Sequence, residues 1–262
     1  MTWDPAQYLK YEGHRLRPAI DLIARIPLAA PGTIVDLGCG AGNVARVLAD
    51  RFAGATIDGV DSDKAMLARA RESTATDPRF RWNEGDLAHW HPPYPVDVIF
   101  SNAALHWLGA HDALFPALMQ KLAPHGVLAV QMPDNHAAPS HEALFDTARS
   151  LRWRSLAEPL MRTRPVAPLE SYHAWLAPLA HKLDLWRTTY LQALPPTPSG
   201  EHPIVAWMRG STLTPFVPVL GADAEAFVAD FAARVEAAYP RQREGGVLFP
   251  FSRVFVVAQR GA

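Results

Sequence analysis

The sequence has almost no cysteine and almost no net charge. Cys39 is the only cysteine among 262 residues, which excludes an intrachain disulfide and a two-cysteine metal or redox motif. The formal charge is −1 at pH 7, so there is no electrostatic reason to expect a nucleic-acid partner or binding to an anionic membrane surface.

Long hydrophobic runs are also missing. No stretch of about 18 uncharged apolar residues occurs, so no membrane-spanning helix is expected. The first residues, Met1-Thr2-Trp3-Asp4-Pro5, lack the basic-then-apolar pattern of a secretory signal. Hydrophobic residues make up 49% of the chain and charged residues 19%, which excludes a disordered chain. We therefore expect a cytoplasmic protein with one large domain, or one domain that carries a sizeable insertion.

Short apolar and β-branched runs alternate with helical spacing through the first half of the chain. The segments expected to be strands are 33–37, 56–60, 79–83, 96–100, 126–132, 183–190 and 253–259. Val44, Val47 and Leu48 show helical spacing after the first strand. This alternation predicts an α/β fold with a doubly wound, mostly parallel seven-stranded sheet. Ligands in such folds bind at the carboxyl ends of the strands.

Two stretches interrupt this rhythm and are expected to form helical insertions. Within 201–239, Phe227, Phe231 and Val235 recur at helical spacing. The predicted core comprises 1–135, 181–194 and 246–262, and the predicted helical substrate cap comprises 136–180 and 195–245.

The glycine loop after the first predicted strand is the strongest single motif. Gly38, Gly40 and Gly42 permit a tight turn and a close approach of backbone to a ligand. A turn with no ligand remains one alternative. A dinucleotide loop wants a third glycine where this chain has Asn43, and Asp36 would repel a pyrophosphate. A carboxylate there favours an ammonium group, which points to S-adenosyl-L-methionine (SAM).

Polar residues follow the next strands. Asp61 ends the second strand and can accept both hydroxyls of a ribose, although NAD also carries this diol. Its alternative role is to cap the following helix, a role that Ser62 or Asp63 could take instead. Asp86 follows the third strand and could accept the adenine amino group, but Gly-Asp is also a common turn. The segment 102–107 follows the fourth strand and would flank the cofactor.

The DLGCGAGN loop, Asp61, Gly85-Asp86 and the Asn102 segment together resemble the class I SAM-dependent methyltransferases. Further stretches resemble one family of that group, the trans-aconitate 2-methyltransferases. They are 3–5 with 8–9, 15–19, 126–135 (GVLAVQMPDN), 186–190 (WRTTY) and 251–258. The resemblance implies a SAM-methyltransferase, Rossmann-like core, and methyl transfer from SAM to a carboxylate of trans-aconitate.

The residues expected at the site follow from these motifs. Those expected to hold SAM are Arg17, Asp36, Gly38, Cys39, Gly40, Asn43, Asp61, Ser62, Asp86, Leu87, Asn102, Ala103 and His106. A small polycarboxylate needs cationic and hydrogen-bonding partners, which are expected to be Tyr8, Tyr11, Asn135, Arg187, Tyr190 and Arg253. No general base is expected, because a carboxylic acid with a pKa of about 4 is ionised at neutral pH. No metal is expected either, since the histidines lack H-E-x-x-H spacing.

Other functions remain open from the sequence. The family pattern places an arginine before a proline where this chain has Thr214-Pro215, with Arg209 nearby. That departure leaves room for a methyltransferase acting on another small-molecule acid or hydroxyl. A SAM-binding protein without catalysis and a nicotinamide-dependent oxidoreductase are further alternatives, the latter disfavoured by Asp36 and Asn43. The sequence does not predict an oligomeric state.

Overall fold

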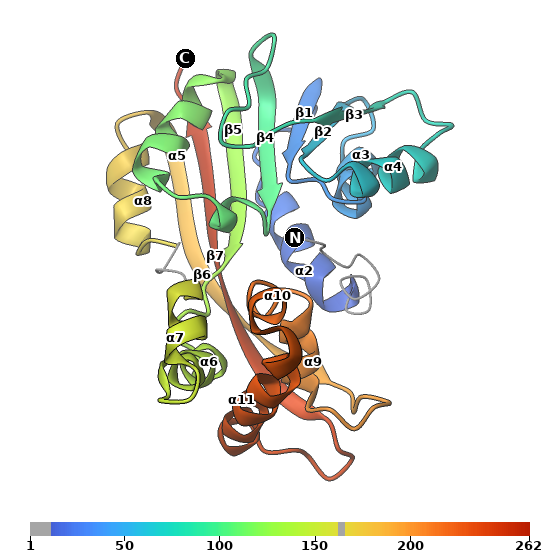
Figure 1. Cartoon of the computed structure of the whole chain (residues 1–262). Helices are drawn as coiled ribbons and strands as arrows, with labels where there is room; N and C mark the ends of the chain where they lie inside the picture. The colour runs from blue at the N-terminus through green and yellow to red at the C-terminus, as the bar shows by residue number, and fades with distance from the viewer. Residues whose placement is uncertain (1–11, 162–165) are drawn as a thin grey trace. The chain divides into compact units, whose positions relative to one another are not determined.

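Seven strands form one sheet in the order β3-β2-β1-β4-β5-β7-β6 (Figure 1). The computed structural model describes residues 12–161 and 166–262, so the predicted site residues Tyr8 and Tyr11 lie outside the described part. The strands are β1 (Thr33–Leu37), β2 (Thr56–Asp61), β3 (Phe80–Glu84), β4 (Val96–Asn102), β5 (Leu122–Pro133), β6 (Ala180–Leu194) and β7 (Val247–Arg260). The pairings among β1 to β5 are parallel, and β7 runs antiparallel to β5. The predicted fold class is confirmed.

The chain divides into two compact units. The first, here called the sheet unit, contains 13–133, 166–188 and 253–262. Its helices are α2 (Glu12–Ile23), α3 (Asn43–Arg51), α4 (Lys64–Ser73), the short η1 (Leu105–Trp107), α5 (His111–Gln120) and α8 (Leu169–Leu176). The second, here called the helical unit, contains the described residues 12, 134–161 and 189–252. In the described part of the chain, no helix is both long and apolar enough to cross a bilayer.

Helices cover both faces of the sheet. On one face Phe115 of α5 and Tyr172 of α8 pack with Val35, Leu128 and Val256 of the strands; α5 and α8 lie side by side in Figure 1. Successive strand residues point to opposite faces, so alternate residues such as Asp36 and Gly59 belong to the other face. The side chain of Trp82 lies against Gly59 there, and its indole N–H donates to Thr74, just beyond α4, at 3.0 Å.

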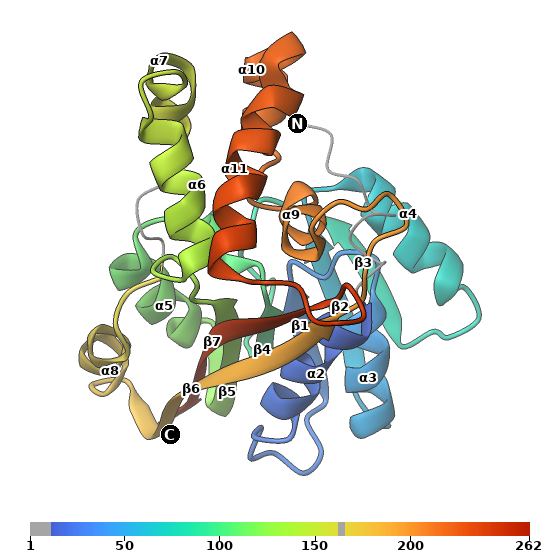
Figure 2. The same cartoon turned by 90° about the horizontal axis from the view of Figure 1, so that it is seen from below.

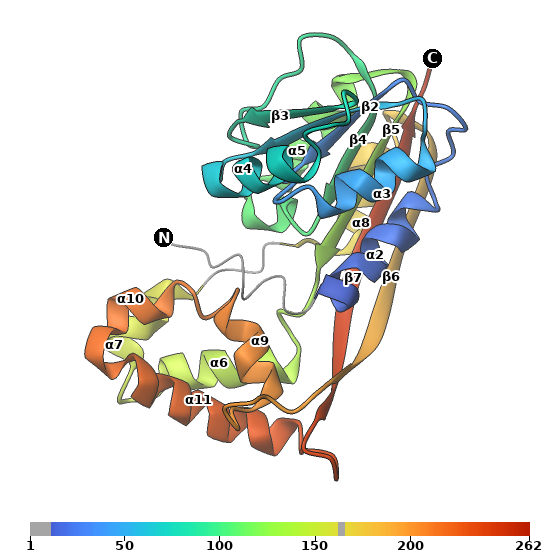
Figure 3. The ribbon, with the colours of Figure 1, turned by 90° about the vertical axis from the view of Figure 1, so that its right-hand side faces the viewer.

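The helical unit has its own apolar core. Its helices are α6 (Pro139–Arg149), α7 (Arg154–Ala157), η2 (Glu158–Leu160), α9 (Pro203–Arg209), α10 (Phe216–Leu220), η3 (Gly221–Asp223) and α11 (Ala224–Ala238). α6 lies beside α11 in Figures 2 and 3. The predicted helical spacing is confirmed, because Phe227, Phe231 and Val235 are all buried on α11. Trp153 packs edge-on against Phe227, which adds an aromatic contact to this core.

The unit boundaries differ from those expected from the sequence. Residues 166–180 group with the sheet unit, because α8 packs against α5. The last residues of β6 and the first of β7 group with the helical unit instead. Both strands run longer than predicted, and in these extensions buried residues alternate with exposed ones, as at Phe249, Pro250 and Phe251. The exposed Pro250 conceals this period-two pattern from the sequence.

Candidate functional site

The glycine loop between β1 and α3 takes the conformation that its glycines permit. Gly38, Gly40 and Gly42 have φ angles of 79°, 54° and 78°, in the left-handed region that side chains disfavour. A Cβ on Gly38 would lie 2.1 Å from the Cβ of Ala104, so the close approach of the β4 loop requires glycine there. At Gly40, apart from the glycine and its two chain neighbours, no atom of the described residues lies within 4 Å of the same position. Among the residues that the structure describes, the loop therefore presents uncovered backbone at Gly40.

Asp61 links this loop to the end of β2. The Gly40 N–H donates to Asp61 Oδ2 at 2.9 Å, and the Asp63 N–H donates to Asp61 Oδ1 at 2.9 Å. Asp63 caps α4, since its Oδ1 accepts from the N–H groups of Ala65 and Met66 at 2.8 and 3.1 Å. The alternative in which Asp61 is the helix cap is therefore excluded. Each carboxylate oxygen has a second lone pair that can accept a ligand hydroxyl.

Asp36 on β1 is a buried carboxylate with an unused acceptor. It is 2% exposed, and its Oδ2 has no hydrogen-bond partner among the described residues. Burial, followed by the nearby charge of Asp61, raises the pKa of Asp36 to about 7. Two neighbouring carboxylates in a poorly solvated place favour a bound cation. Burial also raises the pKa of the Cys39 thiol above its ordinary range, so Cys39 is a poor nucleophile, and its part in holding the cofactor stays a prediction.

The ends of β3 and β4 supply the next predicted residues. Asp86 is exposed, and it accepts from the Ala88 N–H at 2.9 Å and pairs with His89 Nδ1 at 2.7 Å. The bond with His89 lowers the pKa of Asp86, so this carboxylate is ionised. Leu87 lies near Gly38. Asn102 ends β4, and its buried Oδ1 has no partner among the residues described. These side chains leave acceptors beside the loop.

The remaining predicted cofactor residues are less closely joined to the loop. Ser62 is exposed directly after Asp61. Asn43 begins α3 and accepts from Arg46 at 3.0 Å. Ala103 has a positive φ of 56° and donates its N–H to the Gln131 carbonyl at 2.9 Å. His106 stacks obliquely on Trp107 in η1, with ring centroids 4.8 Å apart. Arg17 lies on α2 and is exposed.

The predicted substrate residues fall in different units. Arg253 belongs to the sheet unit, is 3% exposed, and donates from Nη1 to Gln131 Oε1 at 3.0 Å. Arg187 belongs to the same unit and is exposed on β6. Asn135 and Tyr190 belong to the helical unit, where both are buried. The roles of these residues toward a substrate stay predictions.

Asn135 has a structural task as well. Its Nδ2 donates to the Ser252 carbonyl at 3.0 Å, and its Oδ1 accepts from the Ser252 N–H at 2.8 Å. The side-chain amide thus bonds to both backbone groups of Ser252, as a neighbouring strand would, just beyond the Pro133–Arg253 pair that ends the β5–β7 register. One N–H of the amide remains for a further bond.

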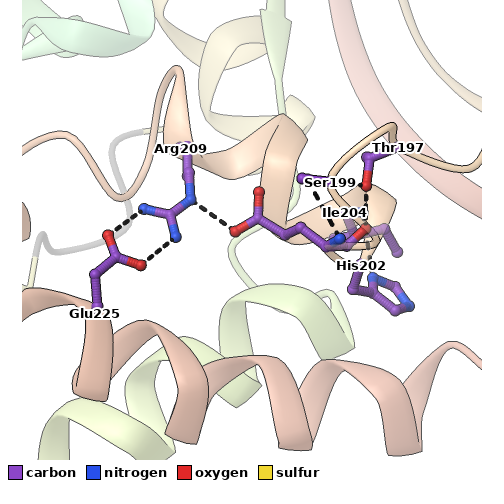
Figure 4. Close-up of polar contacts among 7 residues, drawn as sticks. Thr197, Ser199, His202, Ile204, Arg209 and Glu225 are labelled. Atoms are coloured by element: carbon purple, nitrogen blue, oxygen red, sulfur yellow. Dashed lines mark hydrogen bonds and ion pairs between the residues drawn. The ribbon is translucent and has the colours of Figure 1, made fainter.

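Arg209, the arginine near the departure from the family pattern, is held by two acidic residues of the helical unit. Its Nε donates to Glu201 at 2.7 Å, and its two terminal nitrogens donate to Glu225 at 3.1 and 2.8 Å (Figure 4). Bidentate pairing of this kind fixes the guanidinium plane. Arg209 therefore ties the end of α9 to the start of α11.

The histidines form no metal centre in the part of the chain that the structure describes, where no group of three His, Cys, Asp or Glu side chains could hold an ion. His111 is instead a buried structural residue. Its Nε2 lies 3.0 Å from the Leu105 carbonyl and therefore carries the proton, so Nδ1 accepts from the Tyr172 hydroxyl at 2.7 Å. Burial lowers the pKa of His111, which keeps the ring neutral. This pair fastens η1 to α5 and α8.

Gln131 lies near the carboxyl end of β5 but is not among the site residues predicted from the sequence. It is fully buried on β5 and bonds to Arg253 through its Oε1. The signal that could have found it is a polar residue in an otherwise apolar strand, between Val130 and Met132.

Solved structures share this fold. The YcgJ protein from Bacillus subtilis matches with a TM-score of 0.60 at 17% identity, covering 94% of this chain and 99% of that one. Phosphoethanolamine N-methyltransferase 2 of Haemonchus contortus, solved in complex with S-adenosyl-L-methionine, matches with a TM-score of 0.56 at 18% identity, covering 94% of this chain and 53% of that one. Similarity at this level of identity shows the fold alone.

Sequence relatives are much more similar. A family model described as a methyltransferase domain matches residues 34–126. The trans-aconitate 2-methyltransferase of Methylobacterium nodulans is 46% identical over 261 residues, which cover 98% of both chains. That of an Azoarcus species is 43% identical over 263 residues, which cover 99% of both chains. With this identity running from end to end, over a methyltransferase core whose glycine loop, Asp36 and Asp61 lie at one edge of the sheet, the chain belongs to the trans-aconitate 2-methyltransferase family.

Proposed function

We propose that this chain transfers a methyl group from SAM to a carboxylate of trans-aconitate, giving the monomethyl ester and S-adenosylhomocysteine. The observation that carries the cofactor is the buried Asp36 carboxylate with its unused Oδ2, next to the glycine loop. An ammonium group satisfies this acceptor, whereas the pyrophosphate of NAD would be repelled by it. The substrate rests on the relatives that carry this activity in their names.

The residues present fit SAM. Asp36 would accept from its ammonium group, and the free lone pairs of Asp61 would accept from the ribose diol. Asp86 would accept from the adenine amino group. The bare backbone at Gly40 leaves the room that a close ligand needs. Bound SAM would supply an electrophilic methyl group on a positively charged sulfur.

The protein's task in such a reaction is to position the acceptor and to exclude water. An ionised carboxylate is already a nucleophile, so no side chain has to remove a proton. Holding the acceptor in line with the methyl group converts a bimolecular encounter into a step within one complex. The buried Arg253 would hold a carboxylate that does not react. The cytoplasmic location and the small-molecule partner expected from the sequence belong to the same proposal.

A second candidate is methylation of another small acid. It is favoured by one observation: Arg209, the arginine nearest in sequence to Thr214, is occupied by Glu201 and Glu225. Thr214-Pro215 is the place where the sequence departs from the arginine that the resemblance implies. Both Arg209 and Thr214 lie in the helical unit and within the predicted substrate cap.

The test is an assay of the purified protein with SAM against a panel of di- and tricarboxylates, with product mass recorded. We expect trans-aconitate to gain one methyl group, with cis-aconitate, isocitrate and citrate as poorer acceptors. Efficient methylation of a phenol or a fatty acid with trans-aconitate inert would overturn the substrate. Tight binding of NADH in a fluorescence titration, without binding of S-adenosylhomocysteine, would overturn the cofactor.

A further inference from the structure

Three buried polar atoms without a hydrogen-bond partner in the described residues lie on adjacent strands of the sheet unit. They are Asp36 Oδ2 on β1, Asn102 Oδ1 on β4 and Gln131 Nε2 on β5. Asp36 pairs in register with Phe100, and Asn102 pairs with Gln131. Residues opposite each other, or two apart on one strand, share a face. The three unused atoms therefore lie on one face, near the carboxyl ends of their strands.

Arg253 on β7 extends this row. Gln131 pairs in register with Phe255, so Arg253 is the diagonal neighbour of Gln131 on the same face. The Arg253 Nη1 donates to Gln131 Oε1 at 3.0 Å. An arginine can only donate, so this bond fixes which end of the Gln131 amide is oxygen. The other end, Nε2, is then a donor that nothing in the described structure accepts from.

The hydrogen-bonding character of the row changes from β1 and β4, which present acceptors, to β5 and β7, which present donors. Asp36 and Asn102 present unused acceptors, whereas Gln131 presents an unused donor beside a guanidinium. A buried amide N–H without an acceptor costs free energy, which a ligand acceptor would recover. A carboxylate is the matching ligand, since its two oxygens can accept from two separate donors and its charge complements the guanidinium.

We propose that Gln131 Nε2 and the Arg253 guanidinium form a two-donor subsite for one carboxylate of the methyl acceptor. The inference rests on the proposed function and adds Gln131 to it as a substrate-binding residue. The bound carboxylate is one that does not react, because donors on the attacking oxygen would stabilise the ground state more than the transition state. The cofactor's own carboxylate is the other source of the same chemistry, and the test separates the two.

The discriminating variant is Gln131→Glu. It keeps an oxygen to accept from Arg253, and it replaces the unused donor with a negative charge that repels a carboxylate. We expect the KM for trans-aconitate to rise at least about 100-fold, with the Kd of S-adenosylhomocysteine changed less than about threefold. Gln131→Met, which removes both polar ends at similar volume, should raise the KM about tenfold or more.

The matched control is Gln259→Glu. Gln259 lies on β7 opposite Val127, toward the amino end of β5, and donates to the His125 carbonyl at 3.1 Å. The same substitution there changes net charge equally and should leave the KM for the acceptor unchanged. Thermal unfolding of all variants shows whether Gln131→Glu is folded, and Gln131→Met tests the same subsite without adding a buried charge.

Calorimetric titration of trans-aconitate into the S-adenosylhomocysteine complex supplies a readout that does not depend on turnover. Binding to the wild type that is lost in Gln131→Glu supports the subsite, even if no ester forms and the proposed reaction fails. Normal methylation by the wild type with an unchanged KM in folded Gln131→Glu overturns the subsite while leaving the reaction intact. A weakened S-adenosylhomocysteine Kd with an unchanged acceptor KM also overturns it and assigns the donors to the cofactor.

Discussion

Gly40 and Asp61 are joined by one hydrogen bond of 2.9 Å, from the Gly40 N–H to Asp61 Oδ2. The bond connects the tip of the glycine loop to the end of β2, while Asp61 Oδ1 accepts from the Asp63 N–H. Asp61 therefore holds the tip of the loop through a bond within the protein itself. A ligand diol that bonds to the same carboxylate would find its partner already oriented, which lowers the entropic cost of binding.

Replacing Asp61 by alanine should weaken SAM at least about tenfold, because a charge-assisted hydrogen bond is worth about 1.5–3 kcal/mol. Isothermal titration calorimetry measures this directly. Asp63→Ala is the matched control, since it removes the α4 cap bonds to Ala65 and Met66 and should cost about 1 kcal/mol of stability with little change in SAM affinity. An unchanged Kd in folded Asp61→Ala would remove Asp61 from the site.

Asp36 should make stability depend on pH. Its pKa is raised from 3.8 to about 7 by burial and by Asp61, so the native state binds this proton more tightly than the unfolded chain does. The resulting stabilisation is complete below about pH 4 and is lost as pH rises through about 7. The asparagine of the Asp36→Asn variant cannot ionise, so the variant should not lose stability in this pH range through residue 36. Relative to the wild type, the variant should therefore gain up to about 4 kcal/mol between pH 4 and 8.

Urea unfolding of both proteins at several pH values measures this difference, and titrating groups that do not interact with Asp36 cancel in the subtraction. A stability difference between wild type and Asp36→Asn that is flat across pH 4–8 would contradict the buried, unpaired carboxylate. The same variant should bind SAM more weakly at pH 7, because the ammonium loses its charged partner. Stability and cofactor affinity should thus move in opposite directions.

Any side chain at Gly59 should destabilise the protein while Trp82 is present. A Cβ on Gly59 would lie 2.3 Å from the Trp82 ring and 2.9 Å from Cys39 Sγ. Gly59→Ala should therefore cost about 1–3 kcal/mol by overpacking. In a Trp82→Leu background the same change should cost at most about half as much, a coupling that a double-mutant cycle measures. Gly54→Ala is the control, since within the described part of the chain no atom beyond its sequence neighbours lies within 4 Å of its Cβ position. Equal costs in both backgrounds would show that Trp82 does not set the requirement.

The sequence predicted the strand ladder well because alternating runs and turns are local signals. Strands β1 and β2 end where their residues predicted, at Leu37 and Asp61. The unit boundaries were less predictable. Nothing in segment 166–180 shows that Tyr172 bonds to His111, a residue far earlier in the chain. Such long-range partners decide where a helix packs, and local periodicity does not contain them.

The same distinction applies to the site. Asp36 and the glycines were predictable because a strand-to-helix turn fixes their neighbourhood. The role of Asn135 as a backbone partner of Ser252 was not, since the register of β7 against β5 decides it. Gln131 was not predictable for a related reason: its proposed role depends on the bond from Arg253, a diagonal neighbour on another strand. Pairing across a sheet carries this information.

The arginines should affect acceptor binding more than the chemical step. The methyl donor is a cation and the acceptor an anion, so charge is neutralised as the methyl group moves. A guanidinium on the attacking oxygen would slow the reaction, whereas one on a carboxylate that does not react contributes equally to the ground and transition states. Arg253→Gln and Arg187→Gln should therefore raise the acceptor KM roughly 10- to 1,000-fold while changing kcat less.

Acceptor ionisation alone should shape the chemical step's pH profile. The rate at saturating SAM should level off above the acceptor's own pKa values, because no side chain has to accept a proton. Since His111 is held neutral between Leu105 and Tyr172, it adds no limb near pH 7. Steady-state kinetics of the wild type and of folded Arg253→Gln and Arg187→Gln across pH test both the rise in acceptor KM and the shape of the pH profile. A large fall in kcat at unchanged KM, or a histidine-like limb assigned to methyl transfer, would mean that a side chain takes part in the reaction and that positioning alone does not account for it.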